Sequence, residues 1–140
     1  MRIGSDEVTI EVESEQTAGA ILAIEVQMAA GGGPPALHRH AAQEIYRVDR
    51  GELTLYLEDG HGEVQPVVAG PGAVVHIPGG RMHTVRNESK ADASAYVVFA
   101  PGTDMEQFLR AADRLTAAGA RGIEEVLALA QRHGIEMEAA

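Results

Sequence analysis

The amino-acid sequence predicts a mainly β protein, in which one antiparallel β-barrel or closed sandwich over about residues 8–100 is followed by two short α-helices. Short segments of alternating apolar and polar residues recur along the first hundred residues, and turn signals separate them roughly every eight to twelve residues. At Pro101-Gly102 the apolar spacing changes to that of a helix. The length of 140 residues favours a single domain that takes in the whole chain, residues 1–140.

The strands are predicted from their alternation. Val8, Ile10 and Val12 alternate with polar residues, which is typical of a half-buried edge strand. Residues 22–28 repeat the pattern, and the glycines and prolines of residues 31–35 end it. Further strands are predicted at residues 44–48, 53–57, 64–68, 73–77, 82–85 and 95–100.

Local signals fix how two of these strands are connected. Asp59-Gly60 predicts a hairpin after the strand that carries Leu53, Leu55 and Leu57, and these three leucines are expected in the core. Pro66 in the following strand cannot donate a ladder hydrogen bond. It therefore indicates a sheet edge or a bulge.

The helical extension is predicted at about residues 103–134. Thr103 and Glu106 have the spacing of a capping box, and apolar residues at helical spacing follow them. A second helix has one apolar face. We expect both helices to pack on the outside of the β unit; their apolar positions are Met105, Phe108, Leu109, Ala112 and Leu115, then Ile123, Val126, Leu127 and Ala130.

Composition excludes several classes of function. The formal net charge of −10 and the aromatic content of 4% argue against binding to nucleic acid or to an anionic membrane surface. The absence of cysteine excludes disulfides, thiolate metal sites and cysteine nucleophiles. The N-terminus is charged and lacks the apolar core of a signal peptide, and no apolar run is long enough to span a bilayer, so we expect a cytoplasmic protein without membrane partners.

Four residues have the chemistry of a metal site. His38 and His40 lie two residues apart, so in an extended chain both imidazoles point to the same face, and Glu44 follows in the same phase. A closed barrel can bring His83, on another short strand, to the same point. Three neutral nitrogens and one carboxylate suit iron, manganese, nickel, cobalt, copper or zinc rather than calcium or magnesium. We predict one such divalent ion per chain, with coordination positions left open for a ligand.

Two segments of the sequence resemble the two motifs of the cupin family, with every spacing kept. The ten motif positions are Gly32, His38, His40, Glu44 and Gly51 in the first segment, then Gly72, Pro78, Gly80, His83 and Asn87 in the second. Ten positions at fixed spacing are far more specific than a single glycine pattern. The resemblance covers about residues 20–100, and the tail from Pro101 resembles, more loosely, the helical extension of small bacterial quercetinase-like cupins.

The resemblance implies a single cupin barrel of the jelly-roll type and a role for each motif residue. His38, His40, Glu44 and His83 would be the metal ligands. The glycines Gly51, Gly72 and Gly80 would occupy turns, and Asn87 would be structural.

Three further residues are candidates for the wall of the cavity. Tyr46 shares the strand phase of Glu44, so it is a candidate for lining the cavity, with a plain core position as the alternative. His76 and Met82 are further candidates for the cavity wall, although His76 could equally face solvent. His61 in a turn and His133 at a helix end are interpreted as residues without a role in the site.

The predicted site suggests a substrate class. Three neutral imidazoles, one carboxylate and a divalent ion carry a net charge of +1, which favours an enolate-, phenolate- or carboxylate-like small molecule. The resemblance implies a quercetinase-like, dioxygenase-type oxidoreductase, in which Glu44 could act as a base as well as a ligand. The alternatives are a non-redox metal-dependent isomerase, cyclase or lyase, and a non-catalytic binding or sensing module.

A homodimer is the expected assembly. Small cupins often pair, and the predicted edge strand at residues 8–12 could add to the sheet of a second copy, which would hide its free backbone groups.

Overall fold

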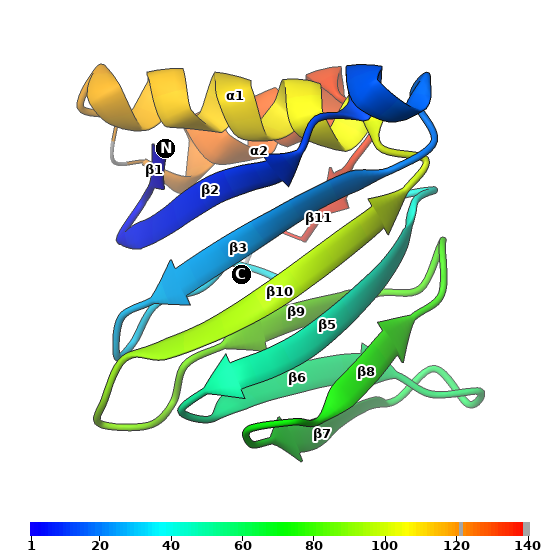
Figure 1. Cartoon of the computed structure of the whole chain (residues 1–140), viewed down its shortest axis with the longest axis vertical. Coiled ribbons are helices and arrows are strands. Elements are labelled where there is room, and N and C mark those ends of the chain that lie inside the picture. The colour runs from blue at the N-terminus through cyan, green and yellow to red at the C-terminus, as the bar shows by residue number, and fades with distance from the viewer. Residues whose placement is uncertain (121, 139–140) are drawn as a thin grey trace.

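Two antiparallel β-sheets face each other in the computed structural model, and two helices lie along one end of them (Figure 1). The structure describes residues 1–120 and 122–138; Arg121 and residues 139–140, which the predicted domain includes, lie outside the described residues. The predicted fold class is confirmed, because the strands pair antiparallel and both helices follow the last long strand.

The first sheet has six strands and the second has five. In spatial order the first contains β1 (Arg2–Ile3), β2 (Asp6–Val12), β3 (Leu22–Met28), β10 (Ala93–Ala100), β5 (Gln43–Arg50) and β8 (Val74–Ile77). The second contains β11 (Glu136–Met137), β4 (His38–Arg39), β9 (His83–Arg86), β6 (Leu53–Glu58) and β7 (Val64–Ala69). A short 3-10 turn, Ser14–Thr17, links β2 to β3.

The core fills the space between the two sheets. Strand alternation directs every second side chain inward, and Val97 of β10 and Val48 of β5 are fully buried in this way. Leu53 and Leu55 of β6 are also fully buried, whereas Leu57 is half-buried at the margin of the core. The predicted leucine positions are therefore confirmed as part of the core.

Strand β10 is the centre of the first sheet. It pairs with β3 on one side, where Val97 is opposite Ile24, and with β5 on the other, where Val97 is opposite Tyr46. The inward residues of these three strands form one continuous apolar surface with a polar patch at Glu44. Several of these inward side chains, among them Ile24, Tyr46 and Phe99, line the cavity described below.

The chain ends are arranged differently from the prediction. Strand β2 is not the outermost strand, because β1 folds back over its beginning and Met1 and Val8 exchange backbone hydrogen bonds of 2.7 and 2.8 Å. Strand pairing with a second copy is thus limited to the part of β2 beyond Val8, and the homodimer stays a prediction. Strand β11 has too few residues for a periodic signal, yet it pairs Met137 with His38 at the edge of the second sheet.

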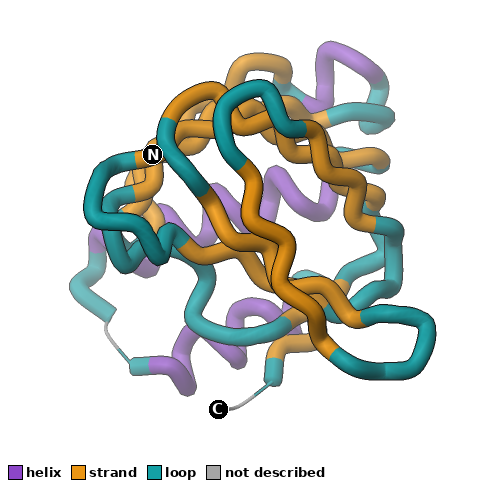
Figure 2. Tube along the Cα trace, turned by 90° about the horizontal axis from the view of Figure 1, so that it is seen from below, coloured by secondary structure: helices purple, strands orange, loops and turns teal. Residues whose placement is uncertain are grey.

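The two helices are α1 (Thr103–Ala117) and α2 (Ile123–Arg132). The predicted capping box is wrong: Thr103 is already helical, and Glu106 instead accepts hydrogen bonds from the Ser14 backbone N–H at 2.8 Å and from Arg110 at 3.0 Å. Glu106 thereby fastens α1 to the turn after β2. Seen from below, the helices lie behind the strands (Figure 2), where α1 contacts β1 and α2 contacts β11. No helix within residues 1–120 and 122–138 is long and apolar enough to cross a membrane.

Asn87 connects the end of β3 to the loop that follows β9, in agreement with the structural role that the motif implies. Its side chain is fully buried, and its amide nitrogen donates to the carbonyls of Met28 and Ala91, both at 2.8 Å. Its amide oxygen accepts hydrogen bonds from the backbone and the hydroxyl of Ser89.

Asn87→Ala should therefore lower the free energy of unfolding by about 2–3 kcal/mol, because buried backbone carbonyls lose their donors. Urea denaturation of the purified variant measures this loss. The exposed neighbour Lys90 provides the control, since Lys90→Ala should stay within about 0.5 kcal/mol of the parent protein. Equal effects of the two substitutions would contradict the role assigned to Asn87.

Candidate metal centre

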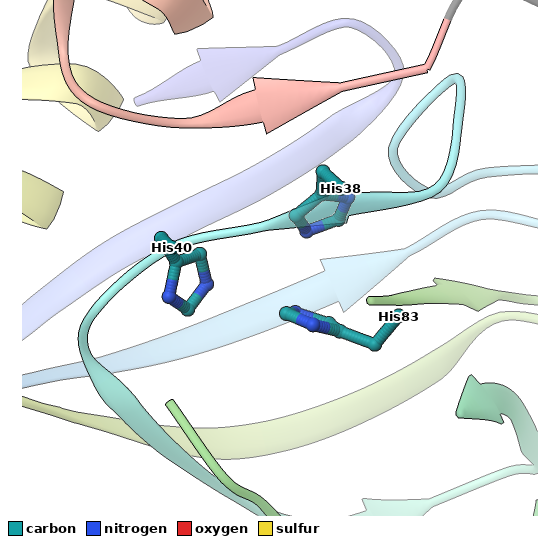
Figure 3. A group of neighbouring side chains, drawn as sticks. All are labelled: His38, His40 and His83. Carbon is teal, nitrogen blue, oxygen red and sulfur yellow. The ribbon is translucent and has the colours of Figure 1, made fainter. Parts of the chain in front are cut away.

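Three histidine side chains from separate places in the fold converge on one point. His38 lies in β4, His83 begins β9 directly opposite it, and His40 lies in the bend that follows β4. A ring nitrogen of each residue lies within 4.8 Å of those of the other two, and the rings face one another (Figure 3). His40 and His83 are buried and His38 is half-buried, so the site is screened from bulk water.

The prediction that one extended segment carries His38, His40 and Glu44 is wrong. The chain leaves the second sheet after Arg39, bends, and enters the first sheet at Gln43. The bend is held by the loop of the second motif, since the backbone N–H of Gly80 donates to the His40 carbonyl at 2.8 Å. A Cβ atom on Gly79 would lie 2.2 Å from the Ala41 carbonyl oxygen, so only glycine fits there.

Each of the three histidines is held in the same way through Nδ1. The acceptors are backbone carbonyl oxygens two residues away: Ala36 for His38 at 3.0 Å, Ala42 for His40 at 3.1 Å and Arg81 for His83 at 2.8 Å. These bonds favour the tautomer with the proton on Nδ1, which leaves Nε2 with a free lone pair. A backbone acceptor on one nitrogen and a metal on the other is the usual arrangement of a ligating histidine.

Glu44 lies beside the three histidines. Its Oε1 atom is 3.0 Å from Nε2 of His40, and its Oε2 atom is 3.8 Å from Nε2 of His83. Burial alone would raise the pKa of Glu44, but the hydrogen bond with His40 and the nearby His83 ring lower it to about 2. The carboxylate is therefore ionised at neutral pH.

The pKa values of His83 and His38 are shifted in opposite directions. Burial alone would lower the pKa of His83, but the Glu44 carboxylate, with a smaller effect of the Arg81 carbonyl, raises it above its ordinary value of 6.5. For His38 burial dominates, followed by the repulsion of the His83 ring, and the pKa is lowered to about 4. At neutral pH the Glu44 side chain is thus anionic and the His38 side chain is neutral.

The donor set fits a transition metal. Nε2 of His83 is buried without a hydrogen-bond partner, although unpartnered buried nitrogens are costly. Nε2 of His40 faces a carboxylate oxygen while Nδ1 of the same ring faces a carbonyl oxygen, and a neutral imidazole has only one N–H to offer. A cation among the Nε2 atoms would satisfy both rings at once.

A cavity of about 690 Å³ opens from this centre. His38, His40, Glu44 and Tyr46 supply polar groups to its wall. Apolar side chains of the first sheet and of α1 complete it, among them Ile24, Val26, Phe99, Met105, Phe108 and Leu109. The C-terminal helices therefore close the cavity rather than pack on the outside of the β unit alone.

The structure places the remaining candidates as follows. Tyr46 lines the cavity next to Glu44, and burial, followed by the Glu44 carboxylate, raises its pKa well above 10. His76 is exposed on β8 and bonds to the Gln43 side chain at 2.9 Å, outside the cavity wall. Met82 is buried but does not line the cavity either.

Two contributors to the site carried no recognisable signal in the sequence. Gly79 occupies a variable position between Pro78 and Gly80, and its close contact with Ala41 follows only from the folded structure. The apolar stripe of α1 showed that the helix would be buried on one face, but not that this face would close the cavity over the metal centre.

Comparison with known proteins decides the family. The family model for the cupin domain matches residues 24–99, which is more than half of the chain. This chain belongs to the cupin family. The match includes both motifs, so all four predicted ligand positions of this cupin lie inside the matched region.

Similar proteins include enzymes and a binding protein. Auxin-binding protein 1 of Arabidopsis thaliana is 32% identical over 79 residues, covering 52% of this chain and 39% of its own. An oxalate oxidase structure superposes with a TM-score of 0.57 at 28% identity, covering 68% of this chain and 50% of that one. An oxalate decarboxylase variant from Bacillus subtilis shares the fold, with a TM-score of 0.62 at 18% identity over 74% and 27%. This cupin thus spans half or less of each of these proteins.

Proposed function

We propose that this cupin is a metal-dependent enzyme whose three histidines and Glu44 hold one divalent transition metal, and that its cavity takes a small molecule with an enolate-, phenolate- or carboxylate-like oxygen. The observation that carries the proposal is the convergence of one ring nitrogen from each of three histidines, all of which are fixed through Nδ1 by backbone carbonyls. A structural neighbour that is an oxalate oxidase supports an oxidoreductase. The dioxygenase type is our proposal from the quercetinase-like resemblance of the sequence.

The bound metal would supply Lewis acidity and, if it is redox-active, electron transfer. The protein supplies the charge balance around it. With three neutral imidazoles and one carboxylate, a divalent ion leaves a net charge of +1 in a largely apolar cavity, where that charge is weakly screened. An anionic oxygen on the ligand would neutralise it.

Glu44 and Tyr46 provide the means to hold or move a proton. A carboxyl group with a pKa of about 2 is a weak base, so Glu44 serves mainly as a charge while His40 and His83 surround it. It would accept a proton at Oε2, the oxygen farther from a histidine nitrogen, once its contact with His83 is released. Tyr46 keeps its proton at neutral pH and can donate it in a hydrogen bond to an oxygen in the cavity.

The size of the cavity favours a ligand larger than oxalate. A volume of about 690 Å³ is in the range of sites that enclose drug-sized molecules. Its apolar wall of sheet and helix side chains suits a hydrocarbon or aromatic body attached to the oxygen head group. Similarity to an auxin-binding protein favours a second candidate, a binding module that retains such a molecule without converting it.

Metal analysis combined with oxygen uptake distinguishes these functions. The protein is purified, stripped and reloaded separately with iron, manganese, nickel, cobalt, copper and zinc, and then given quercetin as a test flavonol. We expect one metal per chain and oxygen uptake with redox-active ions only. Turnover with zinc and no oxygen uptake would indicate the non-redox isomerase, cyclase or lyase instead. Failure to retain any metal would contradict the proposal itself.

Metal affinity should fall as the pH decreases. His83 must lose its proton to bind a metal, and its raised pKa means that protons compete from somewhat above pH 6.5 downward. His38, with a pKa of about 4, stays neutral over most of this range and should not limit binding. Competition with a chromophoric chelator at several pH values measures the apparent Kd for zinc. An affinity that does not change between about pH 5 and 8 would contradict the ligand role of His83.

A further inference from the structure

A second carboxylate lines the cavity apart from the metal centre. Asp6 is the first residue of β2, and its side chain points inward in the same phase as Val8. Only 9% of Asp6 is exposed, and Asp6 lines the same cavity as His38 and Glu44. No sequence motif singles it out, because an aspartate after Gly4-Ser5 reads as an ordinary turn residue.

The carboxylate of Asp6 is not neutralised by its neighbours. Its Oδ1 atom is buried without a hydrogen-bond partner. The two nearest cationic side chains are engaged elsewhere: Arg2 pairs with Glu7, and Arg86 donates to the carbonyls of Pro34 and Gly31. Burial raises the pKa of Asp6 to about 6, although the Gly33 backbone N–H and the more distant charges of Arg86 and Arg2 lower it.

Close packing holds the Asp6 carboxylate in place. A Cβ atom on Gly32 would lie 2.6 Å from Oδ1, so Asp6 rests against the glycine that opens the first motif. The Asp6 charge also adds to the raised pKa of Tyr46, after the larger effects of burial and Glu44. Tyr46 therefore lies within electrostatic reach of both carboxylates, and Asp6 faces the same enclosed space as the metal centre.

A buried, unpaired carboxylate that costs stability and lines a cavity is a characteristic of binding sites. We propose that Asp6 is a second polar contact for the ligand, and that its carboxylate accepts a hydrogen bond from a hydroxyl group on the part of the ligand away from the metal. This inference rests on the proposed function, which places the oxygen head group at the histidines. The ligand is then an amphiphile with a metal-binding oxygen, an apolar body and a distal hydroxyl.

Matched pairs of probes test this assignment. Zinc-loaded protein is titrated calorimetrically with n-alkanoates and with their ω-hydroxy counterparts, from butyrate to decanoate. At one or more chain lengths the hydroxylated probe should bind about ten-fold more tightly than its methyl-terminated partner, which corresponds to about 1.4 kcal/mol. In Asp6→Leu this preference should disappear or reverse, since the acceptor is gone and the site is apolar. Glu7→Gln, an exposed change of charge on the same strand, should keep the preference.

Melting temperature separates a ligand-binding role of Asp6 from a purely structural one. If Asp6 is kept for the ligand, Asp6→Asn and Asp6→Leu should melt at the same temperature as the parent or above it. A fall of more than about 4 °C in both variants would show that Asp6 stabilises the fold, and would overturn the inference.

Two further outcomes would overturn it as well: an equal affinity for both members of every pair, and no binding of any probe to metal-loaded protein. The proposed function fails separately, when the parent protein retains no zinc.

Discussion

His83→Ala should weaken transition-metal binding by at least about 100-fold. His83 supplies the one Nε2 atom of the centre that is buried without any partner, and changes of mere outer-shell groups already weaken metal sites by about 10–100-fold. The variant also leaves the Glu44 carboxylate without one of the two imidazoles beside it. Metal content after gel filtration and the apparent Kd for zinc measure the effect.

The matched control for His83→Ala is His76→Ala. His76 lies on the preceding strand of the chain, β8, but is exposed, and its ring bonds to Gln43 outside the cavity, so its removal should leave metal content unchanged. Both metal-free variants should keep the β-sheet circular dichroism spectrum, because the apolar core between the sheets is untouched. Parent-like zinc affinity in His83→Ala would defeat the ligand assignment.

Gly33→Ala should cost at least about 3 kcal/mol of stability. Gly33 has a φ of +122°, which side chains rarely adopt, and a Cβ atom there would lie 2.2 Å from the carbonyl oxygen of Val85 in β9. The overlap cannot be relieved by a side-chain rotation, because the atoms that the Cβ would meet belong to the backbone of Val85 and Arg86. Chemical denaturation of the metal-free protein measures the loss.

Gly31 is the control that distinguishes the cost of a positive φ from the cost of a steric overlap. Gly31 also has a positive φ, of +80°, but a Cβ atom on it would meet nothing within 4 Å. Gly31→Ala should therefore cost only about 1 kcal/mol, the usual penalty of the left-handed conformation. If both variants lost the same stability, the contact with Val85 would not be the cause.

The sequence was most informative where a pattern repeats or a spacing is fixed. Alternation predicted the strands around Val97 and Leu55, and motif spacing predicted that His38, His40 and His83 meet, which the structure shows. The bend after His40 was not predictable, because phase arguments assume an unbroken strand. The role of His38, His40, His83 and Glu44 as metal ligands stays a prediction.

Features that depend on three-dimensional packing were beyond the sequence. The capping box failed because Glu106 has a better partner in Ser14, a residue far away along the chain. The orphaned carboxylate of Asp6 and the closure of the cavity by α1 likewise arise from contacts between distant segments. Patterns of neighbouring residues in the sequence do not predict such contacts.

The central position of β10 determines when, during synthesis, the first sheet can form. Residues 22–28 and 43–50 have no common partner until residues 93–100 have left the ribosome, because β10 is inserted between β3 and β5. The early part of the chain must wait with exposed strand edges, and pairing between such distant segments is slow. Nascent chains arrested before residue 93 should therefore be open to proteases, and resistance should appear only after the tenth strand has emerged.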